Sequence, residues 1–85
     1  MFLKKAAQAA QIPEDLSRHA VLLRALGRES ILIENYKGIL EYSGECLVVQ
    51  AADCRVRICG KNLWIAYYNE MEMKVCGCIE EIRYC

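Results

Sequence analysis

The sequence predicts a small, mainly β domain: a short N-terminal helix followed by a twisted antiparallel β-meander of about six to eight short strands. From Ser30 onward, apolar and polar side chains alternate with a period of two, and glycine or polar residues interrupt the alternation roughly every eight to twelve residues. Before Ser30 the chain is rich in strong helix formers. With 85 residues, there is room for one domain.

Composition and charge exclude several classes of protein. The chain is 55% hydrophobic with a net charge of zero, which argues against disorder and against a global field that would attract nucleic acid. The basic residues are nevertheless concentrated early, at Lys4, Lys5, Arg18, Arg24 and Arg28. An ordinary solvated surface explains this bias, and salt-sensitive binding to a membrane surface or to nucleic acid is the alternative.

The first fourteen residues are expected to form a helical arm, and residues 15–85 the β domain. Residues 2–11 contain no β-branched residue and no helix breaker, so a helix is expected there. Pro13 interrupts it, because the residue before a proline is pushed away from helical dihedral angles. The start lacks the apolar run of a signal peptide, and no stretch is long enough to span a membrane. A cytoplasmic location is therefore expected.

Residues 16–26 are ambiguous between helix and strand. Their composition fits a helix that ends before Gly27. From Ala20 onward they also fit a strand with Val21, Leu23 and Ala25 on one face, followed by a turn at residues 27–29. The pattern alone leaves both possibilities open.

After Ser30 the expected strands follow one another at short intervals. Alternating segments separated by turn residues predict strands near 31–34, 39–42, 46–49, 55–58, 63–68 and 71–75, with a turn at 60–62. In the last segment, Ile82 and Tyr84 have the opposite parity to Val75 and Ile79. One extra residue at Glu80 and Glu81 would restore the phase, so a β-bulge is expected there.

The strand near 63–68 is apolar on both faces and is the predicted interaction surface. In a regular strand Trp64 and Tyr68 share one face, and Tyr67 lies on the other. Large aromatics supply much of the energy of protein interfaces, so one face is expected to dock a protein partner or a second copy of the chain. Cover by the N-terminal helix is the alternative.

The six cysteines are expected to be reduced and to act as small apolar residues. Their spacing does not match paired zinc knuckles, so no metal and no cofactor is predicted. If a zinc or redox site existed, its ligands would come from Cys54, Cys59, Cys76 and Cys78. The single histidine, His19, lies far upstream of them.

No enzyme motif is present in the sequence. There is no phosphate-binding glycine loop, no nucleophile elbow and no HExxH segment. A non-enzymatic protein with no small-molecule substrate and no nucleic-acid partner is therefore expected.

Three segments resemble the YabP/YqfC sporulation family, and the YqfC branch in particular. The similarity extends over about residues 12–84, and residues 12–15 are similar to the LPxD-like element that opens that domain. The first segment is like IENxxGIxEY, the second like IRIxGxxLxI and the third like GxIxxI. The matching residues are Ile33, Glu34, Asn35, Gly38, Ile39, Glu41 and Tyr42, then Gly60 and Leu63, then Gly77 and Ile79.

The resemblance implies a strand rather than a helix between Val21 and Gly27. It also implies a structural or adaptor role in the mother cell during endospore formation, because members of the branch are commonly encoded beside a membrane protein of the same programme. A sporulation membrane protein is therefore the expected partner. The resemblance supplies no catalytic residues, and the cysteine content of this chain departs from the family pattern.

Overall fold

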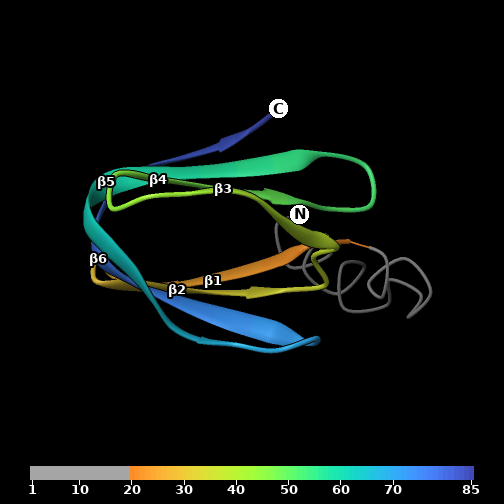
Figure 1. Ribbon diagram of the computed structural model, residues 1–85, viewed down its shortest axis with the longest axis horizontal. Coiled ribbons are helices and arrows are strands. Elements are labelled where there is room, and N and C mark those ends of the chain that lie inside the picture. The colour runs from red at the N-terminus through yellow and green to blue at the C-terminus, as the bar shows by residue number, and fades with distance from the viewer. Residues whose placement is uncertain (1–19) are drawn as a thin grey trace, which may run out of the picture.

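Six antiparallel strands form one sheet that folds over on itself in the computed structural model, which describes residues 20–85 (Figure 1). The strands are β1 (Leu22–Leu26), β2 (Ser30–Glu34), β3 (Gly38–Tyr42), β4 (Cys46–Gln50), β5 (Arg55–Tyr68) and β6 (Glu72–Tyr84). The predicted mainly β class and antiparallel pairing are confirmed for this part of the chain. The helix predicted at residues 2–11 lies outside the described residues. Within residues 20–85, no helix has the length and apolar character needed to cross a membrane.

The ambiguous segment is a strand in its described part. β1 pairs with β2, and Leu23 and Ala25 lie opposite Ile33 and Ile31. These partners belong to the core, so the inward face of β1 is the one that the strand interpretation predicted. The resemblance therefore indicated the correct structure where composition favoured a helix, because burial against a neighbouring strand outweighs intrinsic propensity.

The order of the strands is β1-β2-β6-β5-β4-β3, which differs from a simple meander at one place. The segment from β3 to β6 is a meander, but β2 pairs with β6 instead of β3. The short connection between β2 and β3 passes from one layer of the folded sheet to the other (Figure 1).

The two long strands, β5 and β6, run through both layers (Figure 1). The β1–β2 layer contains β1, β2, the first half of β6 and the second half of β5. The β3–β4 layer contains β3, β4, the first half of β5 and the second half of β6. The turn predicted at residues 60–62 was wrong, because β5 continues through these residues and bends there.

Backbone hydrogen bonds from two turns hold the bend. The Gly60 amide donates to the Glu45 carbonyl at 3.0 Å, so the β3–β4 turn is tied to β5. The Gly77 amide donates to the Glu29 carbonyl, also at 3.0 Å, so the β1–β2 turn is tied to β6. The Gly60 amide therefore finds its partner in a neighbouring turn, and the chain continues through the bend without reversing.

The core lies between the two layers. Its fully buried side chains alternate along the strands as the period-two pattern predicts. The largest of them are Ile31, Ile33, Leu47, Val49, Val56, Ile58, Met73 and Val75.

The β-bulge predicted near Glu80 and Glu81 is confirmed. Cys59 pairs with Glu81, but the next residue of β5, Gly60, pairs with Ile79. Glu80 is therefore the extra residue on β6.

The bulge returns Ile82 and Tyr84 to the core side of the sheet. They lie opposite Ile58 and Val56, both of which are fully buried. Ile82 nevertheless remains 38% exposed and Tyr84 61% exposed. The reason is that this half of β6 pairs only with β5 among the described strands, so it forms an open margin.

Candidate functional site

The outer surface of the β1–β2 layer carries two rows of side chains that each cross four strands. Directly opposite residues of antiparallel strands share a face, so the pairing register defines each row. We call this surface the outer face. The first row is Trp64, Cys76, Ser30 and Leu26, and the second row is Tyr67, Lys74, Leu32 and Arg24.

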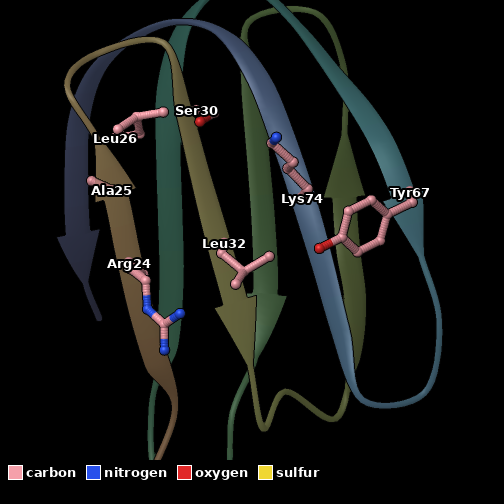
Figure 2. Close-up of a pocket in the computed structure, with 7 residues that line it drawn as sticks. All are labelled: Arg24, Ala25, Leu26, Ser30, Leu32, Tyr67 and Lys74. Carbon is pink, nitrogen blue, oxygen red and sulfur yellow. The ribbon is translucent and has the colours of Figure 1, made fainter.

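The outer face is hollowed where small side chains lie between larger ones. Ser30 and Cys76 are small side chains that lie between Trp64 at one end of the row and Leu26 at the other. An open pocket of about 530 Å³ lies beside them, over the part of the outer face that includes Ser30 and Leu26 of the first row and all of the second row (Figure 2). Ser30 is buried, whereas Leu26 is 69% exposed, so the small residue lies low and the large one stands above it. The result is a groove with apolar walls.

The two aromatic residues of the outer face come from β5. Trp64 is 54% exposed and Tyr67 is 41% exposed. They share a face because Ala66 is an extra residue: Ile65 pairs with Val75, and Tyr67 pairs with the adjacent Lys74. The prediction that Tyr67 lies opposite to Trp64 was therefore wrong.

Tyr68 was predicted to share a face with Trp64, and this was also wrong. It pairs with Met73, which is fully buried on the core side. Its ring stacks on Tyr36, with ring centroids 5.8 Å apart, and the Tyr36 hydroxyl donates to the Asn69 carbonyl. Tyr68 therefore helps to close one open side of the folded sheet and does not belong to the outer face.

Charged groups flank the groove in a defined order. Arg24 forms an ion pair with Glu34 at 3.8 Å, and the Tyr67 hydroxyl donates to Glu72 Oε2 at 3.1 Å. Burial and the contact with Glu72 raise the pKa of Tyr67, so this hydroxyl stays protonated and uncharged at neutral pH. Lys74 forms no ion pair with any residue between 20 and 85. It therefore provides a positive charge beside the apolar groove (Figure 2).

The cysteines named as metal ligands in the sequence prediction do not form a cluster. Cys54 lies in the β4–β5 connection, Cys76 lies opposite Trp64, and Cys78 lies opposite Lys61. Cys59 has a sulfur neighbour, but this is Cys46, which the sequence did not single out. Across the described part of the chain, no three His, Cys, Asp or Glu side chains are placed to hold a metal ion. His19 lies outside this part.

Several family-motif residues hold the fold together. Asn35 adopts a positive φ of 67° and donates from Nδ2 to the Ala20 carbonyl at 2.9 Å. The Tyr42 hydroxyl accepts a hydrogen bond from the Ile65 amide at 3.2 Å, which ties β3 to the second half of β5.

The other motif residues lie in the core, on the strands outside the core, or at the bend. Ile33, Leu63 and Ile79 are buried in the core. Gly38 begins β3, where Ile39 and Glu41 flank a shift in register, and Glu34 is the ion-pair partner of Arg24. Gly60 and Gly77 lie at the bend. The motif therefore encodes mainly the architecture, and the exposed aromatics lie outside it.

Of the seven residues that line the groove, sequence reasoning predicted only Tyr67 as an interaction residue. The others come from β1, β2 and β6, and β6 is far from β1 and β2 in the sequence. Alternation indicates which residues of one strand point outward, but only the pairing register shows which residues of different strands become neighbours.

Comparison with known proteins identifies the family. A search of curated proteins and a search of solved structures gave no match. The model of the YabP family matches residues 15–85, which include all six strands. The chain therefore belongs to the YabP family.

Proposed function

We propose that this chain is a non-enzymatic structural or adaptor module of endospore formation that works through protein–protein contacts. Membership of the YabP family, which is associated with sporulation, supports the biological setting. The three motif segments further support the YqfC branch and a place in the mother cell. The expected partner is the cytoplasmic part of the sporulation membrane protein encoded beside genes of this branch.

The observation that carries the proposal is the composition of the outer face. Trp64 and Tyr67 are both exposed by about half and lie at the β5 ends of two adjacent rows of the outer face, and Tyr67 lines the apolar groove. Exposed aromatics around a pocket are the usual anchors of protein interfaces, where removing one costs about 2 kcal/mol or more of binding energy. The face therefore has the residues and the shape of a docking site.

The groove also limits the chemistry of its partner. Its floor is Ser30, its walls include Leu26 and Leu32, and Lys74 offers a positive charge at its side. An extended peptide segment with one apolar anchor and an adjacent carboxylate complements these features. We therefore assign the groove to an apolar and acidic segment of the partner.

The experiment uses Trp64 as its own reporter, because it is the single tryptophan of the chain. The cytoplasmic part of the neighbouring membrane protein is titrated into the full chain while tryptophan fluorescence is followed. Burial of Trp64 is expected to shift its emission to shorter wavelength. Calorimetry then measures the dissociation constant for the wild type and for variants.

Substitutions distinguish the outer face from other exposed aromatics. Tyr67→Ser is expected to weaken binding by about thirtyfold, as a hot-spot residue would. Tyr84→Ser is the matched control, because Tyr84 is also exposed but lies on the open margin of the other layer. The proposal that the partner docks on the outer face would be wrong if two results were found together. The correctly folded Tyr67 variant would bind as tightly as the wild type, and the Trp64 emission would not change on binding.

A further inference from the structure

Two cysteines face each other across β4 and β5 on the outer surface of the β3–β4 layer. Cys46 and Cys59 are direct partners in the register, and their sulfur atoms are 3.7 Å apart. Their neighbours Leu47 and Ile58 are fully buried, so the two thiols point to the opposite side of the sheet. Within residues 20–85, this is the one pair of cysteine sulfurs in contact.

The backbone geometry at this pair suits a disulfide. The Gly60 amide, one residue after Cys59, donates to the Glu45 carbonyl, one residue before Cys46. This is the pattern that flanks a non-hydrogen-bonded pair of an antiparallel ladder, in which the Cα atoms are about 4.5 Å apart. Disulfides occur at Cα separations of about 4.4 to 6.8 Å. The bond therefore requires rotation of side chains and little movement of the strands.

A cation lies beside the pair. The Arg57 guanidinium donates to the Cys46 sulfur at 3.2 Å. Negative charge on this sulfur is therefore stabilised by a fixed neighbour. Both thiols are half-buried, so they are open to small reagents.

We propose that Cys46 and Cys59 form a reversible cross-strand disulfide when the thiol pool of the cell becomes oxidised, with a low-molecular-weight disulfide such as oxidised glutathione as the oxidant. One cysteine thiolate attacks the external disulfide, breaks its S–S bond and releases one thiol as a mixed disulfide forms. The second cysteine thiolate attacks the protein sulfur of the mixed disulfide and releases the second thiol. Two electrons pass to the external disulfide, and the two protons lost by the cysteines are taken up by the released thiols.

The position explains why the bond is a switch and not a permanent staple. Both cysteines are partly exposed, and exposed disulfides have higher reduction potentials than structural ones. Such a bond is reduced in a normal reducing cytoplasm and forms when the glutathione pool shifts. Cys59 immediately precedes Gly60, so the bond fixes β4 to β5 at the beginning of the bend.

The pH dependence follows from the surroundings of Cys46. Burial first, and then the neighbouring Cys59, raise the pKa of Cys46; Arg57 opposes this rise, and Glu41 on β3 adds to it. Because the thiolate is the nucleophile, oxidation is expected to be slow at neutral pH and to accelerate as the pH rises above it. Arg57→Gln is expected to slow oxidation by about threefold or more, since it removes the stabilising charge.

The experiment equilibrates the reduced 85-residue chain with defined ratios of reduced and oxidised glutathione. Free thiols are then trapped by alkylation, and peptide mapping by mass spectrometry locates the bonds. A peptide pair that joins Cys46 to Cys59, has lost two hydrogen atoms and disappears in reduced glutathione is expected. The variant with serine at positions 54, 76, 78 and 85 is expected to retain this bond, and Cys46→Ser is expected to abolish it.

Peptide mapping of the wild type tests the proposal even if the variant with four serine substitutions does not fold. Complete alkylation of Cys46 and Cys59 in oxidised buffer would overturn the proposal, whether or not other cysteines became oxidised. A bond that fully reduced glutathione does not open would also overturn it, because the site would then be a permanent staple. The test does not use the proposed partner, so its outcome does not depend on whether the outer face is a docking site.

Discussion

Gly60 and Gly77 leave space for each other's strand at the bend of the sheet. A Cβ atom on Gly60 would lie 1.9 Å from the carbonyl oxygen of Cys78, and a Cβ atom on Gly77 would lie 2.5 Å from the carbonyl oxygen of Asn62. Gly77 also has a φ of 134°, which side chains of L-residues rarely permit. The two glycines belong to the second and third motif segments. Both are therefore required for the same reason, which is that β5 and β6 approach closely where they pass between the layers.

Alanine at either glycine is expected to destabilise the domain. Each substitution places a methyl group against backbone atoms, which cannot move away as the end of a flexible side chain can. We expect a loss of about 2–3 kcal/mol in the free energy of unfolding for Gly60→Ala and for Gly77→Ala. Urea unfolding followed by circular dichroism measures this. Gly44→Ala is the control, because a Cβ there meets no atom within 4 Å. Equal stability of all three variants would contradict this account of the bend.

Tyr67 and Tyr68 are neighbours in the sequence but are expected to respond differently to substitution. Tyr68→Ser removes the stacking on Tyr36 and is expected to cost about 1 kcal/mol of stability. Tyr67→Ser removes an outer-face side chain that bonds only to half-buried Glu72 within the described region, and is expected to change stability by less than about 0.5 kcal/mol. Urea unfolding of the two variants checks the assignment of faces. A larger loss for Tyr67→Ser would show that the Ala66 bulge is misplaced.

Asn35 is expected to contribute in two separable ways. Its positive φ favours asparagine or glycine, and its side chain also donates to the Ala20 carbonyl. Asn35→Ala loses both features and is expected to cost about 1–2 kcal/mol. Asn35→Gly keeps the backbone conformation and loses the side-chain bond, so its cost is expected to be smaller. Thermal unfolding of the two variants gives the comparison, and a glycine variant that is less stable than the alanine variant would refute the role of φ.

Tyr36 is expected to make stability depend on alkaline pH. Burial first, and then the charge of Tyr68, raise the pKa of Tyr36 above the value of about 10 expected in the unfolded chain. The folded protein therefore binds this proton more tightly, and the stabilisation is complete below about pH 10 and is lost as the pH rises through the folded pKa. At neutral pH, Tyr36→Phe is expected to cost about 1 kcal/mol, because it removes the hydrogen bond to Asn69.

The difference between wild type and Tyr36→Phe isolates this residue from the other tyrosines. Urea unfolding at pH 7, 9, 10 and 11 is expected to show the wild-type advantage shrinking only above about pH 10. A difference that is constant over this range would mean that Tyr36 ionises equally easily in both states.

The extra residue in the last strand shows what can be predicted from sequence. The parity change between Ile79 and Ile82 predicted a bulge, and the register places the extra residue at Glu80. This succeeded because burial of one face selects every second residue along a strand, so a break in the alternation must be matched by a break in the register. The same reasoning did not anticipate the bulge at Ala66, because that segment is apolar on both sides of the break.

The sequence by itself therefore determined the positions of most strands, the buried half of each strand and the family, since these depend on local alternation and on motif residues. Only the tertiary structure decided that β5 bends at Gly60 instead of turning, that β2 pairs with β6, and that Trp64 and Tyr67 share a face. It also placed Cys46 against Cys59. The physical reason is that pairing register is a relation between strands that are distant in the chain. The core is buried only when all the strands are paired.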